Sequence, residues 1–420
     1  MKDKLFSWID NSVNLAVELE TELTKRPAIS PESGGEGEFD KCVFLEKWLR
    51  DHGITKLERY DAPDARAKGG VRPNLIATID GSGGDKEGRL WIISHIDVVP
   101  PGDEKLWDSD PWTVTQKQDS PPDISLKKTG IKLIGRGTED NQQGLVSSVL
   151  AALAFTEQGI KPSRTVKLLF AADEENGSTY GIGWLVKNHP DLFQKNDMAL
   201  VPDGGDPKGE CIEVAEKNIL WMRFVTHGKQ THGSRPDDGA NAFLAGSDLA
   251  VRLRWGLWRK FNSRNPMFDP DYSTFQPTKK EANVPNVNTI PGEDVFYMDM
   301  RVLPHYSASA VFAEIDRIKA DIEEEYHVTV EYFVVQKTES TPTDTNAPIV
   351  ELLTKAANEV YGVNPRPVGI GGGTVAAFLR NIGIDSAVWT KTEETLHQPN
   401  EYALVDNITG DAKVMALLCV

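Results

Sequence analysis

The sequence predicts an α/β protein in which a domain with a largely parallel sheet flanked by helices is interrupted by a smaller α+β two-layer domain. Over residues 1–213, short apolar, β-branched runs alternate with helical stretches, which is typical of parallel βαβ units. Between residues 214 and 336 the runs become longer and half-exposed, and the first pattern then returns. We therefore expect a discontinuous larger domain, 1–213 and 337–420, with an inserted domain at 214–336.

Hydrophobic periodicity defines the elements of the larger domain. Apolar residues recur at helical spacing over residues 4–25, which predicts one long amphipathic helix. The remaining helices are expected at 38–51, 144–157, 182–188, 346–360, 374–380 and 402–418, and the strands at 74–79, 90–94, 131–136, 166–172, 198–202 and 384–390.

The inserted domain is predicted to contain two helices and about four strands, as in a two-layer sandwich. Amphipathic helices are expected at 240–261 and 308–326. Strands are expected at 219–226, 295–303 and 328–335. The polar stretch 262–286, rich in proline and aspartate, is predicted to be a loop or an arm that contacts a partner.

Composition excludes several classes of partner. The 420-residue chain has a net charge of −17 and no basic block interleaved with aromatic residues, so we expect no nucleic-acid binding. No apolar run approaches the ~20 residues that span a bilayer, and the N-terminus does not resemble a signal peptide. Three widely spaced cysteines, Cys42, Cys211 and Cys419, fit neither a disulfide framework nor a zinc ribbon. A reduced, cytoplasmic setting is the simplest prediction.

Ionisable residues follow the predicted strands. His95 and Asp97, Asp140, Glu174 and Glu175, Asp203, and His397 come after five different apolar runs. In an open parallel sheet, ligands bind at the carboxyl ends of the strands. We therefore expect these side chains to gather at one edge of the sheet. Each motif alone has a simpler interpretation: a structural histidine at 95, a helix N-cap at Asp140 and a turn at Asp203.

The pair Glu174 and Glu175 indicates a division of roles. Successive side chains in an extended segment point in opposite directions, so we do not expect the two carboxylates to serve one ligand in the same way. One of them could bind a metal ion while the other transfers a proton. His95 and Asp97, by contrast, are two residues apart, so both side chains are expected on the same face of an extended strand. Asp97 is expected to accept a hydrogen bond from the His95 ring and so orient it.

Together these motifs resemble a known family, the dinuclear zinc hydrolases that include aminoacylase, carnosinase-like dipeptidases, glutamate carboxypeptidases, acetylornithine deacetylase and succinyl-diaminopimelate desuccinylase. The resemblance covers nearly the whole chain. The segments that carry it, in order, are Ser94–Asp103, Trp107 with Asp110-Pro-Trp112, Gly135–Asp140, Asp173-Glu-Glu175, Asp203 and His397. The family fold is a catalytic α/β domain interrupted by a lid or dimerisation domain, in agreement with the pattern described above.

The resemblance implies a site for two divalent ions. His95 and Asp203 would hold one ion, Glu175 and His397 the other, and Asp140 would bridge them. Nitrogen and oxygen ligands suit zinc, and cobalt or manganese remain alternatives. Glu174 would be the general base that takes a proton from a bridging water and delivers it to the leaving amine.

The resemblance also assigns residues of the inserted domain. His232 would stabilise the oxyanion, often from the partner subunit of a homodimer, and Asn288 and Arg301 would hold a substrate carboxylate. The turn containing Gly372, Gly373 and Thr374 would cradle the same group through backbone amides. No lysine follows this turn, so nucleotide binding is not expected.

Two segments depart from the family pattern. Gly371–Thr374 is followed by Val375-Ala-Ala377 in place of a polar or aromatic residue and an arginine, and Asp140 is followed by Asn-Gln-Gln. The predicted function is hydrolysis of an amide bond in a dipeptide or an N-acylated amino acid. A deacylase of the desuccinylase type is the alternative within the same class. A catalytically silent binding protein is the alternative from another class, and retention of Glu174 argues against it.

Overall fold

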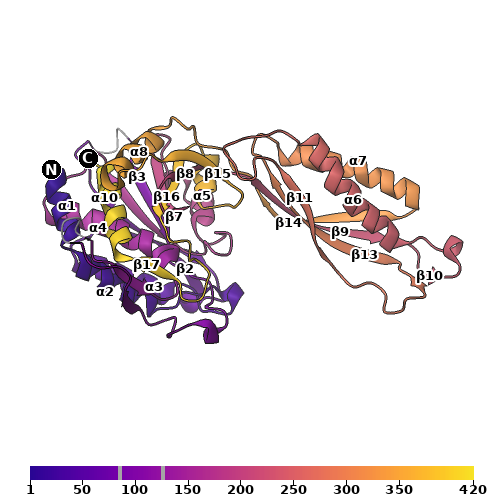
Figure 1. Cartoon of the computed structure of the whole chain (residues 1–420), viewed down its shortest axis with the longest axis horizontal. Helices are drawn as coiled ribbons and strands as arrows, with labels where there is room; N and C mark the ends of the chain where they lie inside the picture. The colour runs from indigo at the N-terminus through magenta and orange to yellow at the C-terminus, as the bar shows by residue number, and fades with distance from the viewer. Residues whose placement is uncertain (84–87, 124–127) are drawn as a thin grey trace. The chain divides into compact units, whose positions relative to one another are not determined.

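The structure is a computed structural model that describes residues 1–83, 88–123 and 128–420, and it divides into two compact units (Figure 1). Unit 1 consists of residues 1–214, 343–367 and 374–420, and unit 2 of residues 215–342 and 368–373. The α/β class with an inserted second unit is confirmed. The expected domain limits stay a prediction, and this division differs from them in assigning 337–342 and 368–373 to the inserted unit.

An eight-stranded mixed sheet forms the centre of unit 1, and its last two strands continue into unit 2. Neighbouring strands run parallel from β6 through β3 and β7 to β16, whereas β1, β2 and β8 pair in an antiparallel manner. The order is β1 (Leu57–Pro63), β2 (Val71–Ile79), β6 (Val166–Ala171), β3 (Leu90–His95), β7 (Met198–Asp206), β16 (Asp385–Lys391), β8 (Cys211–Glu216) and β15 (Arg366–Ile370). The parallel centre matches the prediction, and the edges make the sheet mixed.

Both faces of this sheet are covered, which explains why its central strands are apolar throughout. Trp91 and Ile93 of β3 pack with α5 (Ile182–Asn188) and α9 (Ala376–Asn381) on one face. Ile92, between them, points to the other face, where it lines a small gap with Ser148 and Ala152 of α4 (Gly144–Glu157). This alternation is the period of two expected for a strand.

The remaining helices of unit 1 are α1 (Lys2–Asp10), α2 (Val13–Thr24), α3 (Phe39–Asp51), α8 (Pro348–Tyr361) and α10 (Val405–Leu417). The single helix predicted over 4–25 is wrong, since α1 and α2 are separate. Asn11 donates its side-chain amide to the Ser7 carbonyl, and the Ser12 hydroxyl donates to the Ile9 carbonyl. Such local bonds compete with helical ones and end α1 here.

A second, three-stranded sheet lies in unit 1 and explains why α10 begins later than predicted. Its strands are β4 (Thr115–Gln118), β5 (Ile131–Ile134) and β17 (Tyr402–Leu404), with β5 in the middle. Tyr402 pairs with Ile134 in an antiparallel register, so the first residues of the predicted helix form a strand. This pairing places the segment before α10 next to the segment that leads to Asp140.

Unit 2 is a two-layer α+β sandwich. Its antiparallel sheet has the order β11 (Thr274–Lys280), β13 (Glu293–Val302), β9 (Asn218–His227) and β14 (Thr329–Thr338). Helices α6 (Ala242–Lys260) and α7 (Ala308–Tyr326) lie side by side over one face (Figure 1). The side chains of Asn241 and Ser307 cap their N-termini.

The prediction that 262–286 is a loop is wrong in part, because it contains β11. This strand pairs only with β13 and lies at the edge of the sheet. It therefore lacks the alternating apolar pattern of a half-buried strand, and its Pro277 and lysines are residues that edge strands tolerate.

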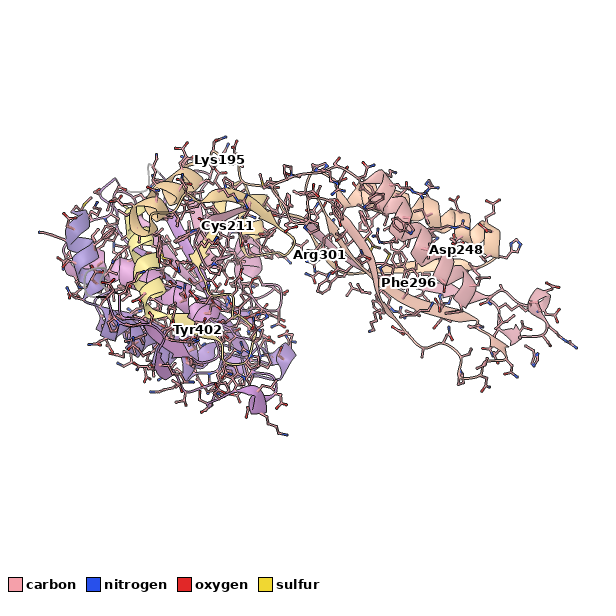
Figure 2. All side chains as sticks on the ribbon, viewed as in Figure 1. Lys195, Cys211, Asp248, Phe296, Arg301 and Tyr402 are labelled. Carbon is pink, nitrogen blue, oxygen red and sulfur yellow. The ribbon has the colours of Figure 1, made fainter. Side chains whose placement is uncertain are left out.

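Side chains of β13 divide between the two faces of the unit 2 sheet. Phe296, Met298 and Met300 pack in the core with α6 and α7. Arg301, five residues from Phe296, therefore lies on the face away from the helices; both residues are labelled in Figure 2. Among the described residues, no helix combines the length and apolar character that crossing a membrane requires.

Candidate active site

The predicted site residues of unit 1 do gather at the carboxyl edge of its parallel strands. His95 is the last residue of β3, Glu174 and Glu175 follow β6, and Asp203 lies within β7. His397 lies in the loop after β16, and Asp140 lies in the segment Thr138–Gln143 that precedes α4, with non-helical backbone angles at Asp140 itself. These segments are far apart in sequence, and the order of the parallel strands brings them together.

Asp140 lies between two histidines and offers one carboxylate oxygen to each. Its Oδ1 is 2.9 Å from His95 Nε2, and its Oδ2 is 3.1 Å from His397 Nε2. His397 Nε2 also lies 3.1 Å from Glu175 Oε2, and His95 Nε2 lies 3.5 Å from Asp203 Oδ1. This is the arrangement expected of a carboxylate that bridges two ligand pairs.

Glu174 and Glu175 belong to different ligand groups, as their adjacency suggested. Glu175 shares one group with His95 and Asp140, and Glu174 shares another with His95 and Asp203. Within each group, all the ligand atoms lie within 4.8 Å of one another. The Glu174 carboxylate thus lies beside His95 and Asp203, the pair that the resemblance gives to one ion. Glu175 lies near Asp140 and His397, its expected partners at the other ion.

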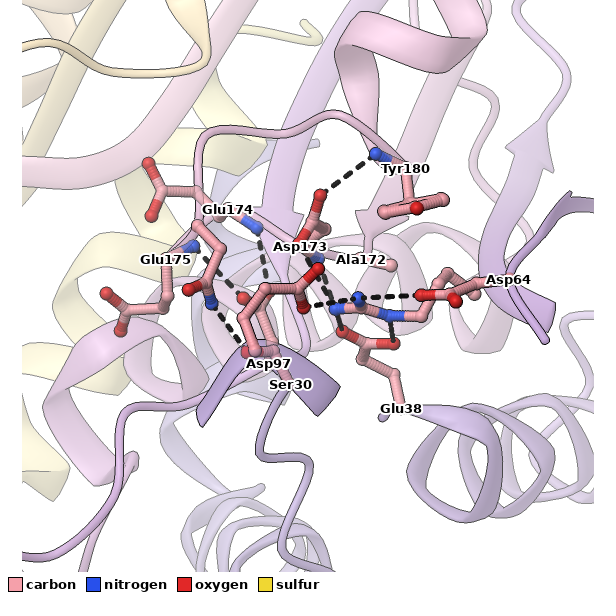
Figure 3. A network of polar contacts seen from close by, with 12 residues as sticks. Ser30, Glu38, Asp64, Asp97, Ala172, Asp173, Glu174, Glu175 and Tyr180 are labelled. Carbon is pink, nitrogen blue, oxygen red and sulfur yellow. Dashed lines mark hydrogen bonds and ion pairs between the residues drawn. The ribbon is translucent and has the colours of Figure 1, made fainter. Parts of the chain in front are cut away.

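Asp97 orients more of the site than the sequence indicated. The closest acceptor for His95 Nδ1 is the Asp97 backbone carbonyl at 2.9 Å, and the Asp97 carboxylate lies 3.5 Å away. That carboxylate accepts bonds from the backbone N–H groups of Glu174 at 3.1 Å and Glu175 at 3.0 Å (Figure 3). A single buried residue therefore holds both the imidazole and the glutamate pair.

A buried ionic network supports the start of the glutamate loop (Figure 3). Asp173 has φ of 62°, a left-handed conformation that is unusual for aspartate. Its carboxylate accepts from the Tyr180 amide at 2.9 Å and lies 3.3 Å from the Arg72 guanidinium. Arg72 and Glu38 are each 0% exposed and form an ion pair. The network holds Asp173 in a conformation that a flexible loop would not maintain.

Asn141, part of the segment that departs from the family pattern, links three of the site segments. Its amide nitrogen donates to Asp203 Oδ1 at 2.8 Å and to the Pro202 carbonyl, and its oxygen accepts from the His95 amide at 3.2 Å. Gly144 allows this close approach, because a Cβ there would lie 2.3 Å from the Pro202 oxygen. The sequence did not identify Asn141 as a site residue, although the departure at this position was a signal.

Burial in this cluster opposes the charged form of both glutamates, whereas the neighbouring carboxylates favour the charged form of His397. Burial, together with the Asp203 carboxylate, raises the pKa of Glu174 well above its ordinary value. Burial also raises the pKa of Glu175, with Asp140 adding to the effect. Hydrogen bonds to Asp140 and Glu175 raise the pKa of His397 to about 10. Buried carboxylates of this kind are stabilised when they coordinate metal ions.

The donor set fits divalent metal ions. Two imidazoles and several carboxylates supply only nitrogen and oxygen, the ligands that suit zinc, cobalt or manganese. The residues that would hold the ions are His95, Asp140, Glu175, Asp203 and His397. A cavity of about 260 Å³ adjoins them, lined in part by Asp140 and Asp203. It is large enough for part of a small substrate.

Unit 2 brings two of its predicted residues together. His232 lies on β10 (Thr231–His232), which pairs with β12 (Thr289–Ile290), and its pairing partner is Thr289. The Gly233 amide donates to the Asn288 carbonyl at 2.7 Å, so Asn288 is adjacent to His232. His232 is exposed, and its Nδ1 lies 2.8 Å from the Ser234 hydroxyl.

Arg301 is engaged within unit 2. Its Nε and Nη2 donate to the two oxygens of Asp299 at 2.8 and 3.0 Å, and its Nη1 donates to the Gly371 carbonyl at 2.8 Å. Gly372 and Gly373 are exposed in the following turn. The Thr374 hydroxyl accepts from the Ala376 amide at 3.2 Å, at the start of α9. The contact of Arg301 with Asp299 was not predicted from the sequence.

The fold and the cluster together define a metal-dependent hydrolase, and comparison with known proteins agrees. Residues 91–420 match the family described as Peptidase family M20/M25/M40. That match covers more than half of the chain, and the protein belongs to this family. The resemblance found in the sequence, the fold class and the enzyme class are thereby confirmed.

Relatives extend over almost the whole chain. An uncharacterized metallohydrolase of Methanococcus maripaludis is 37% identical over 416 residues, covering 95% of this chain and 97% of the relative. A succinyl-diaminopimelate desuccinylase of a Sulfurovum species is 24% identical over 396 residues, covering 93% and 95%. The structure of aminopeptidase PepT from Bacillus cereus has a TM-score of 0.75 at 19% identity, covering 97% and 98%, which shows the shared fold.

Proposed function

We propose that the protein is a cytoplasmic hydrolase that cleaves the amide bond of a dipeptide or an N-acylated amino acid with two bound divalent ions, most simply zinc. The observation that carries this proposal is the position of Asp140, with one oxygen toward His95 and the other toward His397. In this assignment His95 and Asp203 would hold one ion, Glu175 and His397 would hold the other, and Asp140 would contribute to both.

Glu174 is the proposed general base. When bound, the ions would polarise the amide carbonyl and lower the pKa of a water between them. The Glu174 carboxylate takes a proton from the attacking water and delivers it to the leaving nitrogen. Its position is supported by the Asp97 carboxylate, which accepts the Glu174 backbone N–H at 3.1 Å.

Residues of unit 2 would complete the reaction. His232 is proposed as the donor that stabilises the developing oxyanion. Asn288 and Arg301, with the turn of Gly372, Gly373 and Thr374, are proposed to hold a substrate carboxylate. For Arg301 this requires exchange, because Asp299 now occupies the guanidinium.

Two substrate classes fit the site. The cavity of about 260 Å³ beside Asp140 and Asp203 supports a small substrate. Similarity to proteins described as succinyl-diaminopimelate desuccinylase supports an N-acyl amino acid. Aspartate rather than glutamate at 203 resembles the dipeptidase and aminopeptidase branches of the family, which supports a dipeptide. A direct screen decides between them. Metal-free protein reconstituted with zinc, cobalt or manganese would be tested on dipeptides and on N-acetyl and N-succinyl amino acids. Hydrolysis of none of them would favour a binding protein.

A variant tests the assignment of the ions. His397→Ala removes one proposed ligand and leaves His95, Asp140 and Asp203 in place. We expect metal content to fall from two ions per chain to one after dialysis. The control is His189→Ala, a histidine of unit 1 in another part of the fold that packs on Tyr60 and Trp184. Retention of two tightly bound ions by His397→Ala would exclude its ligand role.

We also propose that a second copy of the chain docks on unit 2, giving a homodimer. Helix α6 exposes Phe243, Leu244, Val251 and Trp255, each between 46% and 56%. A groove of about 450 Å³ runs between α6 and the edge strand β11. Apolar surface beside an unpaired strand edge is what a second sheet can cover. Light scattering should show a dimer for the natural protein and a monomer for V251D/W255D, while V43D on α3 should remain dimeric.

A further inference from the structure

Two buried glutamates connect the segment that carries Asp140 to the segment that carries His397. Glu139 precedes Asp140 in the chain, and Glu401 follows His397 by four residues. Glu139 is 7% exposed and Glu401 is 0% exposed. Neither residue belongs to the proposed ligand set, so their burial beside it requires another explanation.

Glu139 binds the segment that leads to His397. Its Oε1 accepts from the Thr392 hydroxyl at 2.5 Å and from the Glu393 amide. Its Oε2 accepts from the Thr395 amide at 2.5 Å and from the Thr395 hydroxyl at 2.6 Å. All four bonds are charge-assisted, the stronger class of hydrogen bond, and all reach the same stretch of four residues.

Glu401 binds the segment that carries Asp140. Its Oε1 accepts from the backbone N–H groups of Gly137, Glu139 and Asp140 at 3.1, 3.0 and 3.0 Å. Its Oε2 pairs with the buried guanidinium of Arg136. The contact is therefore reciprocal: each ligand segment holds the other through a glutamate of its own.

The loop after β16 needs such support. Glu394, His397 and Asn400 have φ of 59°, 60° and 60°, in the left-handed region that side chains other than glycine rarely adopt. The loop has no helix or strand of its own between β16 and β17. Its conformation, and with it the position of the His397 ring, depends on contacts with its surroundings.

We propose that Glu139 and Glu401 are positioning residues that fix the separation of Asp140 and His397, and so set the affinity of the ion held between those two ligands. This inference rests on the proposed two-metal site. His95 and Asp203 would hold the other ion, and neither of them lies on the two segments that Glu139 and Glu401 join. Loss of the contact should therefore weaken one ion selectively, whereas a general loss of stability would weaken both.

Glu139→Gln tests the proposal. Glutamine keeps the length of the side chain but presents an NH₂ donor to groups that are themselves donors. We expect the dissociation constant of the more weakly held Zn²⁺ to rise about 10- to 100-fold, the usual effect of losing a residue that orients a ligand. The other Zn²⁺ should change less than about threefold. The measurement is zinc titration of metal-free protein, with metal content determined after dialysis.

A matched control lies on the same segment. The Glu393 carboxylate accepts from the Asn407 amide of α10 at 2.9 Å instead of from the Asp140 segment. Glu393→Gln removes the same charge at nearly the same place and should retain both ions with natural affinity. Equal losses in Glu139→Gln and Glu393→Gln would overturn the proposal, because they would indicate an effect of charge alone.

Hydrogen exchange in the metal-free protein gives a second readout that does not depend on catalysis. The contacts are made by the protein itself, so Glu139→Gln should accelerate amide exchange at Glu393 and Thr395. Unchanged exchange would overturn the proposal. If Glu139→Gln does not fold, Thr392→Val removes a single donor from the same carboxylate and should shift the same ion in the same direction by a smaller factor.

A double variant assigns the effect to one ion and separates this inference from the proposed function. In a His397→Ala background only one ion remains, and adding Glu139→Gln should not change its affinity; a further loss of tenfold or more would contradict the assignment. Natural protein that binds two ions but hydrolyses no substrate would refute the proposed function alone. Natural affinity for both ions in Glu139→Gln would refute the positioning role alone.

Discussion

The two units present their candidate residues in different ways. In unit 1, His95 is 2% exposed, and its ring, the glutamate pair and Asp203 are all held by Asp97 or Asn141. In unit 2, His232 is exposed and Arg301 is bound to Asp299 of its own strand. The candidate metal ligands of unit 1 are thus held mainly by buried neighbours, although the His397 side chain is 49% exposed, whereas the residues proposed to hold substrate are exposed or are occupied by other protein groups.

This difference assigns separate tasks to the units. Preorganised ligands bind metal without a large rearrangement, and second contacts that lock them are what such sites require. In the proposed function Arg301 would exchange Asp299 for a substrate carboxylate, so its contribution would depend on the substrate. We expect variants in unit 1 to affect metal binding, turnover and stability, and variants in unit 2 to affect substrate affinity and selectivity. The following predictions are arranged by expected effect.

The largest effect is expected for Glu174→Gln. The variant loses the proposed proton carrier, so kcat should fall about 10²- to 10⁴-fold. Both ions should remain after dialysis. Unchanged turnover would exclude the general-base role. Loss of an ion would instead make Glu174 a ligand, since it lies in one group with His95 and Asp203.

A matched pair of arginine variants compares the ionic contacts of the units. Arg72 is 0% exposed and paired with Glu38, whereas the Arg301 side chain is 26% exposed and paired with Asp299. Arg72→Met should lower the free energy of unfolding by about 3–5 kcal/mol, because Glu38 would remain buried without its partner. Arg301→Met should change it by about 0–1 kcal/mol. Urea unfolding of the metal-free variants measures both, and equal values would contradict the comparison.

His232→Ala should lower kcat about 10²- to 10³-fold, the typical loss for one oxyanion donor, with metal content unchanged. Mixing this variant with Glu174→Gln shows whether the histidine acts across a dimer. With random association, about half of the dimers contain one copy of each variant. If His232 acts in trans, one of the two sites in each mixed dimer is intact, so the activity should recover to about a quarter of that of the natural protein. No recovery in verified mixed dimers would place His232 in the same subunit as its metals.

The smallest effects are expected at the contact between Arg301 and Asp299. Arg301→Ala should raise KM about tenfold for a substrate with a free carboxylate, which corresponds to about 1.4 kcal/mol. Asp299→Asn weakens the competing contact and should lower KM by about two- to threefold. An amidated substrate should respond to neither change. Equal effects on the amidated substrate would exclude Arg301 as the carboxylate anchor.

Most helices and strands with a buried face were predictable, although the buried strand β8 was missed, and two other misses have identifiable physical reasons. Strand β11 lies at an edge of its sheet and carries exposed polar residues, so no alternating pattern marks it. The break between α1 and α2 results from side-chain bonds of Asn11 and Ser12 that do not interrupt the apolar period. Apolar periodicity marks a helix or strand that has one buried face. It does not mark an exposed element, and it does not show where local side-chain hydrogen bonds end a helix.

The sequence predicted which residues form the site. It did not predict the buried contacts that hold those residues in place. Adjacent glutamates after a strand indicated two roles, and the structure places them in two ligand groups. The contacts of Arg72 with Glu38, and of Glu139 with Thr395, join residues that are separated by 34 and 256 positions. Nothing in either local sequence specifies the other, because the pairing depends on which segments the sheet brings together.

By itself, the sequence determined the fold class, the family resemblance and the order of the ionisable residues along the strands, since these depend on local periodicity and on short motifs. Only the tertiary structure decided that Asp140 faces both histidines, that Asp97 holds the glutamate pair through its carboxylate, and that Arg301 is occupied by Asp299. These are distances between segments that are remote in the chain. They follow from strand order and core packing, which fix positions that no single segment encodes.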